Sequence, residues 1–172
     1  GSMPMFDVEY IFLQIRSKSV GEVSKLKVLC RDDGETYANV EVDLTEIEVQ
    51  VNDDHTNKIE LTDEMGVIMR YPTIDSFSTA GISDITADNM LDVIVTCIDK
   101  IYDKKGEDVY DSKDSSQKEL MDFVEGMNTQ QFQDVQAFFD SMPKLRHEIT
   151  VVNPKTKVEN VVALSGLNDF FG

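Results

Sequence analysis

The sequence predicts an α+β protein: an N-terminal antiparallel β-sheet, a mainly helical part of about three helices, a late β-hairpin and a short C-terminal helical turn. Three observations support this prediction. Apolar and polar residues alternate through much of the first part, which is the period of a sheet with one solvated face. Apolar residues recur at helical spacing between residues 86 and 142. Two further alternating segments flank the turn residues NPKTK at 153–157.

The N-terminal sheet is expected to contain several strands. FDVEYIFLQIR at 6–16 alternates apolar residues at its start and predicts a long, buried strand. VSKLKVLC at 23–30 predicts a second strand, which the turn residues of RDDGET end. NVEVDL, IEVQV and KIEL alternate in the same way, and VIMRYP at 67–72 predicts a strand that enters a loop. We expect antiparallel pairing, because no helical segment separates these pieces.

The helical part is expected to follow a linker, STAGISD at 78–84. This linker divides a β-rich part, 3–77, from an α-rich part with the terminal hairpin, 84–172. We expect the two parts to pack together as one compact unit. Gly1 and Ser2 are interpreted as the remnant of a cleaved tag and left out.

Three helices are expected in the α-rich part. Thr86 can cap a helix that runs through Tyr102 and carries a wide apolar stripe. A second helix begins near Ser116, which has capping-box spacing with Glu119. A third begins at Asn128 and ends before Pro143, which cannot continue a helix.

Charge restricts the classes of partner. The chain carries 33 acidic and 16 basic residues, a formal charge of −17. Such a field repels phosphate backbones and anionic lipids, so we expect no nucleic-acid or membrane partner. The excess of acidic residues either keeps the protein soluble or steers it toward a basic partner protein. The two cysteines show no pairing pattern, and we expect an intracellular protein.

The sequence contains no strong motif for a catalytic or metal-binding site. The two histidines, His55 and His147, have no nucleophile near them in sequence and are expected at the solvated surface. The acidic clusters at 32–33, 53–54 and 103–111 lack the spacing of a calcium loop and are expected to be solvated turns. We therefore expect no enzyme activity, no catalytic residue, no cofactor and no metal.

Aromatic residues near the C-terminus provide the candidate contacts. The third helix has more aromatic area than a small helix needs, and core packing is favoured for it over a partner groove. Leu167, Phe170 and Phe171 have the spacing of one face of a helical turn, which we expect to dock on its own domain. If the protein is a binding module, the contact candidates are Phe138, Phe139, Met142, Phe170 and Phe171, with Arg16, Lys18 and Arg70 as polar anchors.

Five stretches in order carry a family resemblance: FDVEYIFLQIRSKSVGE, MGVIMRYP, VTCIDKIYD, FFDSMPKL and LSGLNDFF. Together they resemble the baseplate hub assembly proteins of T-even-type (T4-like) contractile-tailed bacteriophages. The resemblance runs from Met5 to Phe171. It implies a non-enzymatic role in the host cytoplasm, or in the virion tail baseplate, with other hub or tail proteins as partners and the tape-measure protein as one candidate.

One departure from that family concerns zinc. Some relatives carry Cys-x-x-Cys pairs near the second strand and in the late hairpin, which would form a structural zinc site. Here Cys30 stands alone and the late turn has no cysteine, so we expect no zinc. The comparison nevertheless predicts that the second strand and the late hairpin lie side by side, with Cys30 near Asn153.

Two other classes of function stay open. A cytosolic metal-dependent hydrolase would hold two or three carboxylates in one concave pocket. A general substrate-binding chaperone would expose an apolar groove.

Overall fold

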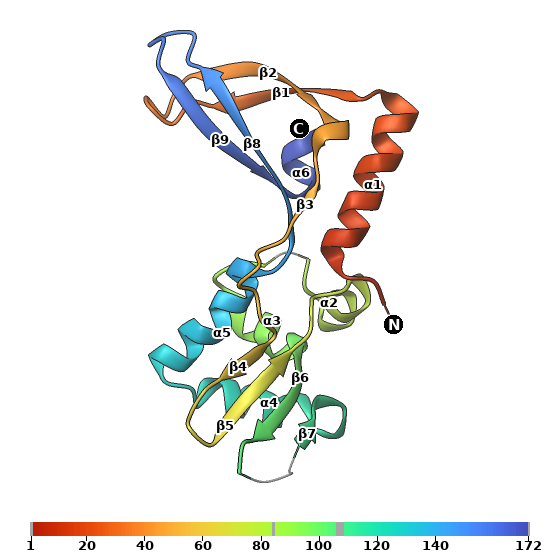
Figure 1. Ribbon diagram of the computed structural model, residues 1–172, viewed down its shortest axis with the longest axis vertical. Coiled ribbons are helices and arrows are strands. Elements are labelled where there is room, and N and C mark those ends of the chain that lie inside the picture. Colours follow the sequence, from red (N-terminus) through yellow and green to blue (C-terminus); the bar gives the residue numbers. More distant parts are fainter. Residues whose placement is uncertain (1, 84, 106–108, 172) are drawn as a thin grey trace. The chain divides into compact units, whose positions relative to one another are not determined.

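Two compact units make up the computed structural model, which describes residues 2–83, 85–105 and 109–171 (Figure 1). Unit 1 consists of Gly1–Met5 and Asn52–Met142, and unit 2 consists of Phe6–Val51 and Pro143–Gly172. The described residues contain both α-helices and antiparallel strands, so the predicted α+β class is confirmed.

Unit 1 is built on a four-stranded antiparallel sheet with the strand order β4-β5-β6-β7. The strands are β4 (Lys58–Glu60), β5 (Met65–Met69), β6 (Ile98–Asp103) and β7 (Val109–Asp111). The helices are α2 (Ile74–Ala80), α3 (Met90–Cys97), α4 (Gln117–Glu125) and α5 (Thr129–Ser141), with a 3-10 turn, η2, at Ser112–Asp114. Strands β4, β5 and β6 and the helices bury one apolar core that includes Val67, Ile94 and Val135.

Unit 2 combines two small sheets with two helices. Its elements are α1 (Met5–Val20, with Met5 in unit 1), β1 (Val23–Leu29), β2 (Tyr37–Asp43), η1 (Leu44–Glu46), β3 (Val49–Gln50), β8 (Lys144–Val152), β9 (Glu159–Ser165) and α6 (Gly166–Phe171). One sheet is the hairpin β1-β2, and the other has the order β3-β8-β9. Its core includes Leu13 of α1, Ile47 and Leu145.

Residues 6–16 form a helix, so the predicted first strand is wrong. The spacing of Phe6, Tyr10, Leu13 and Ser17 places these four side chains on one side of α1. The helix contains no glycine or proline, and it ends before Gly21, which has a φ of 134°. The alternation at 6–12 arises because α1 has apolar residues on two opposite sides, which mimics the period of a strand.

The predicted helix from Thr86 to Tyr102 is half as long as expected. Helix α3 covers only Met90–Cys97, with Asn89 at its N-terminus, and Ile98–Asp103 continue as strand β6. The segment is rich in β-branched residues, which occur in strands as well as in buried helices. Residues 98–103 form a strand because they pair with β5 and β7. Cys97 is a core residue, and burial raises the pKa of its thiol to about 12.

The predicted linker at 78–84 is mostly not a linker. Its first residues belong to α2, which ends at Gly81 in a left-handed conformation with a φ of 70°; Asp84 lies outside the described residues. The chain instead passes between the two units at residues 5–6, 51–52 and 142–143. The division into 3–77 and 84–172 therefore differs from that of the two units, and packing of the whole chain as one unit stays a prediction.

Other elements follow the sequence closely. Ser116 with Glu119 and Asn128 with Gln131 form capping boxes at the starts of α4 and α5. The second strand is β1, and the late hairpin is β8-β9. These predictions are confirmed. They could be made from the sequence because each element depends on a local pattern of hydrogen-bonding side chains or alternating burial.

The ends of the two hairpins of unit 2 are joined by a polar network around Asp32. The Asp32 carboxylate accepts hydrogen bonds from Nδ2 of Asn153 at 2.9 Å, from Nδ2 of Asn160 at 2.9 Å, and from the Thr156 hydroxyl. Asn153 is fully buried. Since Asp32 follows Cys30 by two residues, the predicted proximity of the second strand and the late hairpin is confirmed.

Candidate protein-interaction surfaces

The eight contact candidates from the sequence are dispersed, and three of them are core residues. Phe138 and Phe139 are 2% and 4% exposed in the core of unit 1, and Phe170 is fully buried in the core of unit 2. Phe138 packs edge-on against Phe139, with ring centroids 5.1 Å apart. Burial removes all three from the described surface, and core packing, which the sequence favoured for the third helix, is what the structure shows.

The C-terminal turn docks on its own unit, as expected. In Figure 1, α6 lies beside β8 and β9, and it also contacts β1. The Phe170 carbonyl accepts a hydrogen bond of 2.7 Å from the Ser24 hydroxyl, and the Asp169 carboxylate accepts one of 2.8 Å from the Ser165 backbone N–H. The side chain of Phe170 points into the core, whereas Phe171 is 36% exposed.

Two candidates meet at the surface of unit 2. The Arg16 guanidinium lies over the Phe171 ring, 5.7 Å from its centroid, which is a cation–π contact. Lys18, one half-turn further along α1, is exposed. This contact ties the last turn of the chain to α1.

The remaining two candidates lie in unit 1. Arg70 is exposed, and its Nε and Nη2 atoms donate hydrogen bonds of 3.1 and 3.0 Å to the Thr96 carbonyl. Met142 is half-buried at the end of α5. Met142 packs against the core that contains Phe138 and Phe139.

A surface that the sequence prediction missed lies on α1. Ile11, Phe12 and Ile15 are 43%, 56% and 59% exposed, and Val8 is half-buried. At about 100° per residue these four side chains fall within an arc of about 100°, opposite the side that carries Leu13. We call Val8, Ile11, Phe12 and Ile15 the outer stripe. A helical projection of residues 5–20 would have revealed it, but the strand interpretation placed these residues on alternate faces of a sheet.

The acidity of the chain is concentrated in unit 1. Unit 1 holds 20 acidic and 7 basic residues, whereas unit 2 holds 13 and 9, so unit 1 has a net charge of −13 and unit 2 of −4. On unit 1, Asp122 and Glu125 of α4 and Asp140 of α5 are exposed. Unit 1 is therefore the part of the protein that would attract a basic surface.

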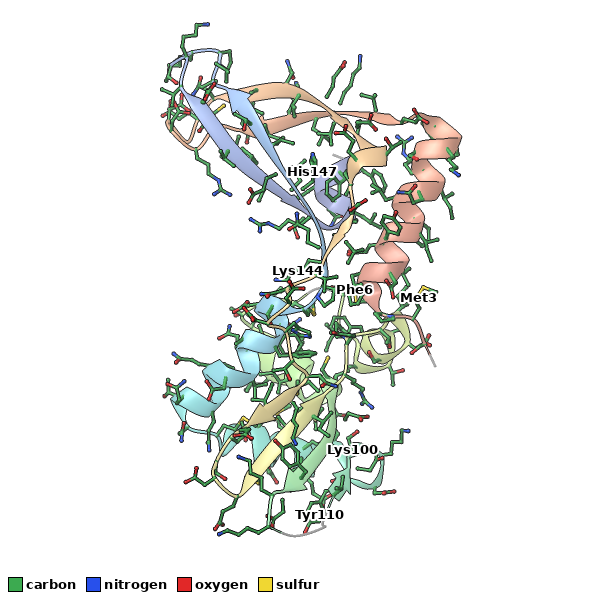
Figure 2. The ribbon with its side chains drawn as sticks, in the orientation of Figure 1. Met3, Phe6, Lys100, Tyr110, Lys144 and His147 are labelled. Atoms are coloured by element: carbon green, nitrogen blue, oxygen red, sulfur yellow. The ribbon has the colours of Figure 1, made fainter. Side chains whose placement is uncertain are left out.

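His55 is a partly buried residue rather than a solvated one, which corrects the expectation. Its ring stacks on Tyr71, with centroids 5.6 Å apart, and lies 5.1 Å from the Phe138 ring. Its Nδ1 atom is 2.8 Å from the Ser141 hydroxyl, and burial lowers the pKa of the imidazole. His147 is half-buried on β8 (Figure 2).

Two surface depressions of unit 1 have the wrong composition for a carboxylate-based site. One, of about 510 Å³, is lined mainly by hydroxyl side chains and Arg70, with Asp75 as its one carboxylate among the described lining residues. The other, of about 460 Å³, contains His55 and a single carboxylate, that of Asp99. Within the described ranges, no three His, Cys, Asp or Glu side chains are grouped so that they could hold a metal ion.

The whole chain, residues 1–172, matches the family described as T4 bacteriophage base plate protein. The chain belongs to this family. No curated protein and no solved structure matched it. The match agrees with the resemblance carried by the five ordered stretches.

As a bacteriophage baseplate protein, the chain works among other tail and baseplate proteins. Its surface is therefore interpreted in terms of protein contacts. The baseplate protein exposes apolar side chains on the outer stripe, and further ones on β7, where Tyr110 is 61% exposed (Figure 2). None of the helices in the described residues has the length and apolar character needed to cross a bilayer.

Proposed function

We propose that this baseplate protein is a non-enzymatic assembly factor or structural component of the baseplate hub, which acts through protein–protein contacts. Membership of the family over the full chain supports the baseplate assignment. The observation that carries the contact mechanism is the segregation of charge, with a net charge of −13 on unit 1 and −4 on unit 2. An acidic unit of this kind favours a basic partner surface and speeds its encounter.

The partners in this proposal are other hub or tail proteins, and the tape-measure protein is one candidate. The protein acts in the host cytoplasm during tail assembly, and retention in the virion tail baseplate is compatible with the same contacts. Exposed candidates from the sequence, Lys18 and Arg70, remain proposed polar contacts, and the buried Phe138, Phe139 and Phe170 do not.

Co-expression with the products of neighbouring tail genes, followed by affinity purification and mass identification, tests this proposal. We expect a monodisperse complex with a hub or tail protein at about 0.15 M salt. We also expect its loss at about 1 M salt, because the screening length falls from about 8 Å to about 3 Å. A failure to bind any tail component at low salt would overturn the proposal.

A charge variant locates the contact. Replacing Asp122, Glu125 and Asp140 of unit 1 by Asn, Gln and Asn should weaken the complex, since all three side chains are exposed on α4 and α5. The matched control replaces Glu22, Glu46 and Glu48 of unit 2 by Gln, which changes the net charge equally at exposed positions. Equal weakening by both variants would contradict a role specific to unit 1.

A further inference from the structure

Helix α1 carries more apolar surface than unit 2 covers. Leu13 is fully buried on its inner side, yet Phe12 and Ile15 are more than half exposed on the outer side. A helix that is apolar on two opposite sides is typical of a helix with neighbours on both. Among the described residues of unit 2 the outer stripe has no such neighbour.

We propose that the outer stripe pairs with the outer stripe of a second copy of this chain, with the two α1 helices antiparallel. The pairing goes beyond the proposed hub function and does not depend on it. Three properties of α1 favour a second copy over a different protein: the symmetry of the stripe, its local neutrality, and the placement of charges beside it.

The outer stripe has the symmetry that an isologous interface needs. In a two-fold dimer the same patch contacts itself, so each residue must suit its mirror position in the sequence. With the axis between Ile11 and Phe12, Val8 faces Ile15 of the second copy, and Ile11 and Phe12 each lie beside the same residue of the second copy. All of these contacts join apolar side chains.

The net charge of α1 allows self-association in an acidic protein. Met5–Val20 contain two acidic residues, Asp7 and Glu9, and two basic residues, Arg16 and Lys18. The helix is therefore neutral, although the chain as a whole has a charge of −17. A basic partner would gain little at this surface, in contrast to unit 1.

The charges beside the stripe select the antiparallel direction. Asp7 and Lys18 are separated by three turns and about 20°, so both lie on the same flank, while Glu9 and Arg16 lie on the other. In an antiparallel pair, each flank of one helix lies next to the same flank of the other helix. Asp7 therefore lies beside Lys18 of the second copy. Parallel pairing would place Asp7 beside Glu9 and Lys18 beside Arg16 of the second copy. Opposed helix dipoles add to the same preference.

The small size of the stripe implies a weak dimer. Four side chains on about two turns bury less than the roughly 800 Å² per partner of a standard stable interface. The dimer should therefore dissociate on dilution, and a single large side chain should contribute much of its stability.

Sedimentation velocity of the purified full chain between about 2 and 200 μM tests the proposal. We expect a monomer–dimer equilibrium whose dissociation constant rises by about tenfold or more in Phe12→Ser. The matched control is Val20→Ser, because Val20 is 67% exposed on the same helix but lies outside the stripe. Asp7→Lys should also weaken the dimer, and Asp7→Lys with Lys18→Asp should restore it, since each copy then carries both reversed charges.

Engineered cysteines test the direction. Oxidation of a mixture of Val8→Cys and Ile15→Cys chains should give a cross-linked heterodimer, whereas Val8→Cys alone should give little cross-linking. The native Cys30 and Cys97 are both fully buried and do not compete.

Four results would overturn the proposal. The first is a monomer over the whole concentration range. The second is a dimer that Phe12→Ser leaves as stable as Val20→Ser does. The third is cross-linking of Val8→Cys with itself but not with Ile15→Cys. A purified monomer that loses a co-purified tail protein on Phe12→Ser would also reject the second copy, while leaving the proposed hub function in place.

Discussion

Asn153 makes polar contacts that no apolar residue could replace. Its Nδ2 donates to the Asp32 carboxylate, and its Oδ1 accepts from the backbone N–H groups of Lys155 at 2.8 Å and Thr156 at 3.2 Å. The side chain therefore folds its own turn and also fixes the turn between β1 and β2. Hydrogen bonds from Asn153, Thr156 and Asn160 hold the pKa of Asp32 below its ordinary value.

Asn153→Ala should destabilise unit 2 by about 1–3 kcal/mol, because it leaves buried hydrogen-bonding partners without their amide. Urea unfolding of the full chain, followed by a probe of β-structure, measures this loss. Lys155→Ala is the control, since Lys155 is exposed and its ion pair with Glu35 spans 3.8 Å at the surface. Equal effects of the two changes would contradict the role given to Asn153.

His55 should make the stability of unit 1 depend on pH. Burial lowers its pKa in the folded state below the ordinary 6.5, so the unfolded chain takes up the proton first as the pH falls. The free energy of unfolding should therefore decrease below pH 6.5. His55→Phe keeps a ring between Tyr71 and Phe138 and should flatten this slope, as measured by denaturant unfolding at pH 5.5 and pH 7.5.

Among the elements, α6 shows how a six-residue helix can be stable at a chain end. Phe170 fills the core of unit 2, Ser24 binds its carbonyl, and Leu167 packs beside it. Burial raises the pKa of Glu9 of α1, whose carboxylate interacts with the Leu167 backbone. The turn depends on these contacts, because a helix of this length is not stable alone.

Phe170→Ala should destabilise the protein by about 3–5 kcal/mol, because it leaves a cavity in the core of unit 2. Phe171→Ala should cost about 1 kcal/mol or less, since it removes an exposed ring and its contact with Arg16. Chemical denaturation of the two variants measures the difference. Truncation after Asn168 should behave like Phe170→Ala, and a truncated chain as stable as the full chain would contradict the core role.

The elements also show which patterns can be predicted from sequence. The starts of α4 and α5 and the hairpin β8-β9 were predictable, because capping boxes and alternation act within a few residues. Helix α1 was not, because its second apolar side lies outside the core of its unit and breaks the usual amphipathic pattern. The boundary between α3 and β6 depends on strands distant in the sequence, which no local pattern contains.

For the whole molecule, the order of the two units along the chain matters. Apart from its first five residues, unit 1 is the continuous segment 52–142, and it lies between the two segments of unit 2. Each unit has an apolar core of its own. The sequence predicted most of the strands and helices but not their division into these units, because the pairing of β3 with β8 joins distant segments.

A fragment of residues 52–142 should fold alone, because its sheet, helices and core are all local to it. We expect cooperative thermal unfolding and dispersed amide signals in an NMR spectrum. The fragment 6–51 should stay unfolded, since β8 and β9, the strands that complete unit 2, lie beyond residue 142. A folded 6–51 fragment with an unfolded 52–142 fragment would contradict this division.

The pairing of Val49 with Leu145 also sets an order of events on the ribosome. Synthesis runs from the N-terminus, so unit 1 can be complete while α1 and the hairpin β1-β2 still wait for β8, β9 and α6. Until these elements have been synthesised, both apolar sides of α1 are bare. A chain released early, without its final phenylalanines, would keep them bare and would be a substrate for host chaperones and proteases.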